Sequence, residues 1–101
     1  MNKARTYYLS SRIVERAQPL LDSGRFDTLS EVCRYAVRSF QEWLDGQEGT
    51  PEVPHLRRTG DYKRSLPLSE WVMQRIMDHD ILGESEIVDY ALDFYLRRNG
   101  L

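Results

Sequence analysis

An internal repeat constrains the fold of this chain more than any other feature of its sequence. ARTYYLSSRIVERA, which begins at Ala4, is similar to KRSLPLSEWVMQRI, which begins at Lys63, with an offset of 59 residues. Further along, SEVCRYAVRSF from Ser30 is similar to SEIVDYALDFY from Ser85, with an offset of 55 residues. Two similar blocks in the same order indicate a true repeat. Because 101 residues are too few for two separate cores, we expect the copies to share one core.

Each copy of the repeat begins with a short segment that is typical of a β-strand. These segments are Thr6–Leu9 in the first copy and Ser65–Leu68 in the second. A serine follows each strand, Ser10 or Ser69, and is expected to accept hydrogen bonds from the free amides that open a helix. A lone strand would leave its backbone groups unpaired, so the two strands are expected to pair antiparallel.

Two helices are predicted after each strand. The first helices cover residues 11–22 and 70–80, and Pro19 is expected to kink or break the earlier one, because proline lacks an amide hydrogen. In the second helix of the first copy, apolar residues follow helical spacing from Leu29 to Leu44. Thr28 and Glu31 form a capping box at its start. The second helix of the later copy repeats the same apolar face, with Ile87, Val88, Ala91, Leu92 and Tyr95.

A linker is predicted between the copies. Glycine and proline recur in this segment, as Gly49, Pro51, Pro54 and Gly60. The chain therefore divides into a first repeat (1–46), a linker (47–61) and a second repeat (62–101) around one shared core.

Strand, helix and helix, in this order and of these lengths, resemble the ribbon-helix-helix family of DNA-binding proteins, which includes the Arc, MetJ and CopG repressors. The resemblance rests on RTYYLS with SGRFDTLSEVCRYAVRSF, and on KRSLPLS with GESEIVDYALDFYL. Family members ordinarily are homodimers with one copy per chain, so this chain resembles a fused, single-chain version. The resemblance implies a mainly α fold with one short antiparallel ribbon, in which two β-α-α repeats form an intramolecular ribbon-helix-helix pseudo-dimer.

Period-two alternation along the strands predicts which side chains of the ribbon face outward. The side chains expected to face the helices are Tyr7, Leu9, Leu66 and Leu68. In the family, the outward side chains read base edges in the major groove of double-stranded DNA. The outward candidates with hydrogen-bonding groups are Thr6, Tyr8, Lys63 and Ser65, whereas Ala4 and Pro67 offer only apolar contact.

The resemblance also implies that amides at the start of each second helix hold DNA phosphates. In the first copy these positions are Thr28, Leu29 and Ser30. In the second copy the position is Ser85, where the acidic neighbours Asp80, Glu84 and Glu86 are expected to weaken the contact.

Four arginines are further candidates for phosphate contact. Arg5 and Arg64 lie near the ends of the predicted ribbon, where their charges reach either phosphate or only water. Arg57 and Arg58, with Lys63 and Arg64, form the one basic cluster of the sequence, for which a solvated linker is the alternative interpretation.

The one cysteine and the two histidines do not suggest an active site. Cys33 occupies an apolar helix position that the other copy fills with Val88, so packing explains it. His55 and His79 have no acid–base or metal-ligating partner in the sequence and are expected to be solvated. We therefore expect no enzyme activity, no cofactor and no metal site.

Composition and charge indicate a folded cytoplasmic protein. The chain is 41% hydrophobic and 30% charged, with a net charge of −2, and no apolar run or signal peptide predicts contact with a membrane. Because this charge does not favour nucleic acid, DNA binding would depend on local geometry.

The leading hypothesis is a sequence-specific transcriptional regulator, a repressor that binds double-stranded DNA. Two alternatives are a protein that neutralises a partner, as ribbon-helix-helix antitoxins do, and a ribbon-helix-helix fold that works through protein contacts alone. Trp43, Phe94 and Leu96 extend beyond the apolar stripes and suggest a surface for self-association on DNA or for a protein partner.

Overall fold

The computed structural model describes residues 2–47, 62–80 and 82–101. Its elements follow the order strand, helix, helix, and then strand, helix, helix again. They are β1 (Asn2–Leu9), α1 (Ser11–Asp22), α2 (Leu29–Asp45), β2 (Tyr62–Ser69), α3 (Glu70–Met77) and α4 (Glu84–Arg98). The predicted linker, residues 47–61, lies outside the described part of the chain except for its first residue.

The two strands form one antiparallel sheet, as predicted. Asn2 lies opposite Ser69, Thr6 opposite Ser65, and Leu9 opposite Tyr62. Both strands are eight residues long, so the shorter predicted strands were wrong at their ends. Pairing along the full length satisfies backbone donors and acceptors even where the side-chain pattern gives no strand signal.

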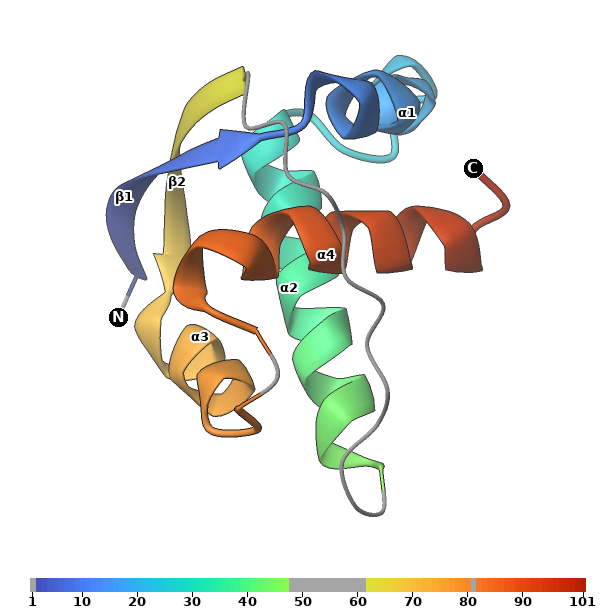
Figure 1. The fold of residues 1–101 in the computed structure, drawn as a ribbon. Coiled ribbons are helices and arrows are strands. Elements are labelled where there is room, and N and C mark those ends of the chain that lie inside the picture. Colours follow the sequence, from blue (N-terminus) through green and yellow to red (C-terminus); the bar gives the residue numbers. More distant parts are fainter. Residues whose placement is uncertain (1, 48–61, 81) are drawn as a thin grey trace.

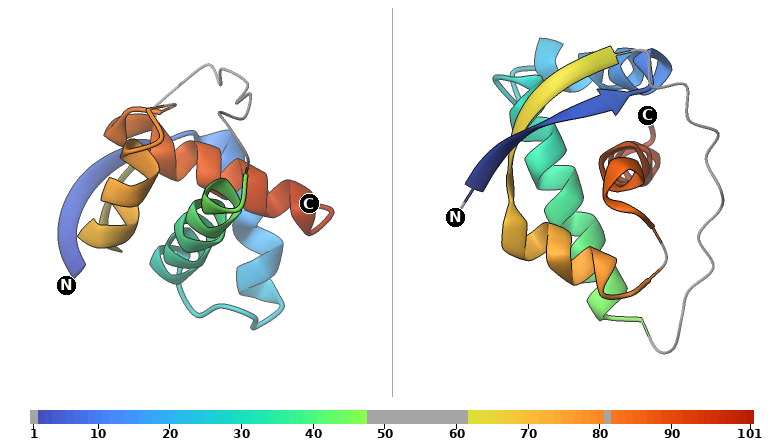
Figure 2. Two further views of the ribbon diagram at one scale, coloured as in Figure 1. Left: turned by 90° about the horizontal axis from the view of Figure 1, so that it is seen from below. Right: turned by 60° about the vertical axis from the view of Figure 1, so that its left-hand side comes forward.

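The ribbon forms a layer on one side of helices α2 and α4, which cross each other (Figures 1 and 2). Helix α1 continues from one end of the ribbon and α3 from the opposite end (Figure 1). Side chains of both strands and all four helices contribute to one buried core. The described part of the chain is therefore mainly helical with one two-stranded antiparallel sheet.

The alternation predicted for the strands is confirmed. The inward side chains Tyr7, Leu9, Leu66 and Leu68 are 6%, 1%, 0% and 2% exposed. Burying such side chains is worth about 1.5–3 kcal/mol each, which fixes the register, because a slip of one residue would turn them all to solvent.

Aromatic rings fill the crossing of α2 and α4. Phe40 is fully buried, and its ring lies 5.1 Å from that of Tyr90 and 5.4 Å from that of Phe94, measured between centroids. Phe94 also lies 5.1 Å from Trp43. Leu96 is fully buried, so it does not belong to an exposed surface, contrary to prediction. Instead, most of the expected surplus apolar surface packs inside the molecule.

Helix α1 runs unbroken from Ser11 to Asp22 with Pro19 inside it, so the predicted break was wrong. The proline lies in the last turn of α1 with its side chain exposed, and the helix continues for three residues beyond it. Helix α3 ends at Met77, three residues before the predicted end, and Asp80 beyond it has a positive φ of 55°.

Two of the predicted helix caps are confirmed and one is wrong. The hydroxyl of Thr28 accepts a hydrogen bond from the Glu31 amide at 3.2 Å, and the Ser69 hydroxyl accepts one from Val72 at 3.4 Å. The Ser10 hydroxyl caps nothing in α1. The carboxylate of Asp89 in α4 lies at the start of α1 instead, where it accepts from the Ser10 amide.

No helix in residues 2–47, 62–80 and 82–101 combines the length and apolarity needed to cross a lipid bilayer.

Candidate nucleic-acid interface

The outer face of the ribbon presents four polar side chains in two cross-strand pairs. Thr6 lies opposite Ser65, and Tyr8 lies opposite Lys63. All four are exposed, Tyr8 by 48%. The sequence prediction that these side chains point outward is confirmed. Their contact with DNA stays a prediction.

The size of this array suits the major groove of B-form DNA. Side chains two residues apart on one strand are about 7 Å apart, and neighbouring strands lie about 4.8 Å apart. The major groove is about 12 Å wide and admits a two-stranded ribbon. Hydroxyl groups and an ammonium group can hydrogen-bond to base edges there, and the ammonium group favours the two acceptors of guanine.

The outer face changes character along the ribbon. Thr6 and Ser65 lie at its centre, with Tyr8 and Lys63 on one side and Pro67, whose register partner is Ala4, on the other. We call the side with Lys63 and Arg64 the Lys63 end, and the side with Arg5 and Pro67 the Arg5 end. Pro67 is half-buried and carries no hydrogen-bonding side chain. The polar groups therefore lie at the centre and at the Lys63 end.

Arg5 lies between two glutamates at the Arg5 end. Its Nη1 atom donates to Oε1 of Glu84 at 2.5 Å, and its Nη2 atom lies 3.6 Å from Oε1 of Glu70. The Glu84 hydrogen bond and charge raise the pKa of Arg5 above its ordinary value. Among the described residues these three line a groove of about 490 Å³ at the starts of α3 and α4. The charge of Arg5 is thus already balanced within the chain.

Arg64, the residue of the second copy that corresponds to Arg5, has different surroundings. It is half-buried and has no ion-pair partner among residues 2–47, 62–80 and 82–101. Its positive charge acts on Cys33 of α2, whose pKa is raised to about 12, chiefly by burial, against the opposing effect of Arg64. Cys33 is fully buried, so the prediction that it serves packing is confirmed.

The starts of α2 and α4 also differ in charge. The first turn of α2 contains Glu31, whose amide is bound by the Thr28 hydroxyl. The first turn of α4 contains Glu84 and Glu86, and no side chain caps it. These carboxylates balance the positive end of the α4 helix dipole and oppose an anion there.

Not all predicted phosphate contacts can be placed. Leu29 is buried, Ser30 is half-buried and Thr28 is exposed at the start of α2. The side chain of Ser85 and the whole of Arg57 and Arg58 lie outside the described residues.

Sequence reasoning missed two buried carboxylates on α4. Asp89 is 4% exposed and accepts hydrogen bonds from the Ser10 amide at 3.1 and 3.2 Å, one to each oxygen. Asp93 is 5% exposed and lies 2.6 Å from Nη1 of Arg16 and 3.0 Å from Nε of Arg97. A polar residue next to the apolar stripe of a predicted helix was the available signal. These residues join α4 to α1.

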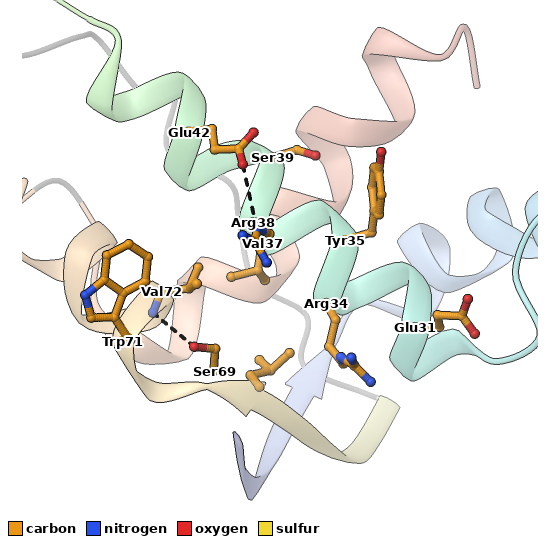
Figure 3. Close-up of a pocket in the computed structure, with 11 residues that line it drawn as sticks. Glu31, Arg34, Tyr35, Val37, Arg38, Ser39, Glu42, Ser69, Trp71 and Val72 are labelled. Carbon is orange, nitrogen blue, oxygen red and sulfur yellow. Dashed lines mark hydrogen bonds and ion pairs between the residues drawn. The ribbon is translucent and has the colours of Figure 1, made fainter. Parts of the chain in front are cut away.

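The described residues also line a groove of about 640 Å³ between α2 and the end of β2 (Figure 3). Arg34 and Tyr35 of α2 lie on one side, and Ser69 and Trp71 on the other (Figure 3). Trp71 is 60% exposed, which makes the groove a candidate for protein contact.

His79 is not solvated and unpaired, contrary to prediction. Its Nε2 atom lies 3.0 Å from Oδ1 of Asp45, and Oδ2 of the same carboxylate accepts hydrogen bonds from Arg75 at 2.7 and 2.9 Å. This cluster ties α3 to the end of α2. Within the described parts of the chain, no three His, Cys, Asp or Glu side chains gather closely enough to hold a metal ion. His55 lies outside those parts.

A scan against protein-family models and searches of curated proteins and of solved structures found no match to this chain.

Proposed function

We propose that this chain is a single-chain ribbon-helix-helix protein: a sequence-specific regulator of transcription, a repressor, that inserts its ribbon into the major groove of double-stranded DNA. The observation that carries the proposal is the outer face of the ribbon. Thr6, Tyr8, Lys63 and Ser65 are exposed together on a two-stranded sheet whose other face is buried.

The register of the ribbon supports the pseudo-dimer. Thr6 and Ser65 correspond to each other in the repeat and lie directly opposite each other in the sheet. An approximate twofold axis through this pair would exchange β1 with β2. It would likewise relate α1 to α3 and α2 to α4, whose order along the chain is the same in both copies. We infer that the one chain supplies both halves of the unit that is a homodimer elsewhere in the family.

Fluorescence anisotropy tests the proposal directly. The protein is titrated into a labelled duplex from the region upstream of its own gene, and into random duplex, over a series of salt concentrations. We expect tighter binding to the upstream duplex, with a logarithm of affinity that falls linearly with the logarithm of salt concentration, by about 0.9 for each phosphate neutralised.

A triple variant separates the ribbon from other DNA-binding surfaces. Thr6→Ala, Lys63→Ala and Ser65→Ala together should abolish the preference for the specific duplex, because base-edge contacts carry sequence preference whereas phosphate contacts do not. Arg98→Ala is the matched control: Arg98 is an exposed cation in the last turn of α4, and Figure 1 shows that this end of the helix points away from the ribbon. An unchanged preference in the triple variant would exclude the ribbon from recognition.

Binding to a protein partner, as an antitoxin does, is the second candidate function. The groove beside Trp71 and the glutamates at the start of α4 favour it. A protein that binds neither duplex at low salt would support this function over the first.

A further inference from the structure

We propose that the ribbon binds an asymmetric DNA site in one fixed orientation, with the Lys63 end making the charged contacts and the Arg5 end held away from DNA by Glu70 and Glu84. This inference rests on the proposed DNA binding and names the class of site that the ribbon would take. It distinguishes Arg64 from Arg5, which the sequence alone offers as like candidates for phosphate contact.

The first argument is the pairing of the two arginines. Arg5 and Arg64 each lie one residue from the central Thr6–Ser65 pair, on opposite sides of it. Arg5 has a carboxylate at 2.5 Å and another at 3.6 Å. Within the described residues, Arg64 has none. A guanidinium group that must first leave a carboxylate gains little from a phosphate, because one charged hydrogen bond replaces another.

The second argument is the distribution of polar groups on the outer face. At the Lys63 end, the exposed ammonium and phenol groups of Lys63 and Tyr8 lie opposite each other. At the Arg5 end, the corresponding pair is Ala4 and Pro67, neither of which carries a hydrogen-bonding side chain. Base edges under the Lys63 end can be read by hydrogen bonds, whereas those under the Arg5 end meet only apolar contact such as a thymine methyl group.

The third argument is repulsion of the DNA backbone at the Arg5 end. Glu70 and Glu84 lie in the first turns of α3 and α4, and both carboxylates lie against Arg5. Phosphate beside these carboxylates would be repelled over the screening length of about 8 Å at physiological salt. Lys3 also belongs to this end by register, and its side chain lies outside the described residues.

Two matched pairs of variants test the polarity with the anisotropy assay. Arg64→Ala should weaken binding to the upstream duplex on the order of tenfold, the equivalent of one charge-assisted hydrogen bond, and lower the salt slope by about 0.9. Arg5→Ala should change the affinity and the salt slope by no more than the control Arg98→Ala does.

The second pair tests whether the ion pair with Glu84 keeps Arg5 from binding a DNA phosphate. Glu84→Gln removes the carboxylate that binds Arg5, whereas Glu86→Gln removes the same charge from the same helix turn without a described contact to Arg5. Glu84→Gln should raise the salt slope by about 0.9, and Arg5→Ala in that background should remove the gain. Glu86→Gln should leave the slope unchanged. A scan of single base-pair substitutions should place the costly positions on one side of the site centre.

The possible results separate this inference from the proposed function. If Arg5→Ala weakens binding as much as Arg64→Ala, or if the costly base pairs fall symmetrically, the polarity is refuted and DNA binding stands. If Glu84→Gln and Glu86→Gln have equal effects on the salt slope, the acidity of the helix turn, and not the Arg5–Glu84 ion pair, determines the slope. The stated role of Glu84 is then refuted. If the unaltered protein binds no duplex at low salt, both the inference and the proposed function are refuted.

Discussion

Replacing the buried Asp89 with alanine should destabilise the protein by removing the acceptor at the start of α1. Both oxygens of this buried side chain accept from the amide of Ser10, which is itself 9% exposed. The variant leaves that amide buried without this acceptor, at a cost of about 1–3 kcal/mol. It also removes a negative charge from the N-terminus of α1, which is worth a further 0.3–1 kcal/mol or so.

The two effects together predict a loss of about 1.3–4 kcal/mol, centred on about 2.5 kcal/mol. In a domain of this size, each kcal/mol corresponds to a shift in melting temperature of about 4–8 °C, so the midpoint should fall by about 10–20 °C. The fold should persist, because typical domains have a free energy of unfolding of about 5–15 kcal/mol. Urea denaturation followed by circular dichroism gives the free energy, and hydrogen exchange should show faster opening of the first turn of α1.

Two further variants make the reasoning refutable. Asp89→Asn keeps an oxygen acceptor for the Ser10 amide and should lose about half as much as Asp89→Ala. Asp27→Ala removes an exposed carboxylate that has no described side-chain partner and should change stability by less than about 0.5 kcal/mol. If Asp89→Ala and Asp27→Ala are equally stable, the carboxylate of Asp89 does not support α1.

The two other predictions concern titrating groups. The hydrogen bonds from His79 and Arg75 hold the pKa of Asp45 below its usual value of 3.8, so its stabilising effect should be complete above that pH and be lost as the pH falls through the lower, folded-state pKa. The difference in unfolding free energy between the protein and Asp45→Asn should therefore shrink as the pH falls below 3.8; a difference that grows there would contradict this. Burial raises the pKa of the Cys33 thiol to about 12, so an aromatic disulfide reagent at neutral pH should react with it only after denaturant unfolds the chain. Rapid reaction of the folded protein would show that α2 opens readily.

The sequence by itself determined the local structure. Alternation in Tyr7–Leu9 and Leu66–Leu68 predicted the inward face of each strand, and helical spacing from Leu29 to Leu44 predicted α2. The Thr28 cap was predictable for the same reason, since its partner lies three residues away. These features depend on residues close together in the sequence, so the spacing of apolar residues along the chain is enough to predict them. The repeat added the antiparallel pairing, because each copy needs a partner for its strand.

Only the tertiary structure decided which charges meet. Arg5 donates a hydrogen bond to Glu84, and the Ser10 amide donates one to Asp89; in each pair the partners are 79 residues apart in the sequence. The sequence placed Arg5 and Arg64 in equivalent positions, and Ser10 in the position of a cap like Ser69. In the structure Arg5 differs from Arg64, and Ser10 differs from Ser69, because α4 brings one carboxylate to Arg5 and another to Ser10. Ion pairs and hydrogen bonds act over a few ångströms, so helix packing rather than the local pattern determines which side chains come within their range.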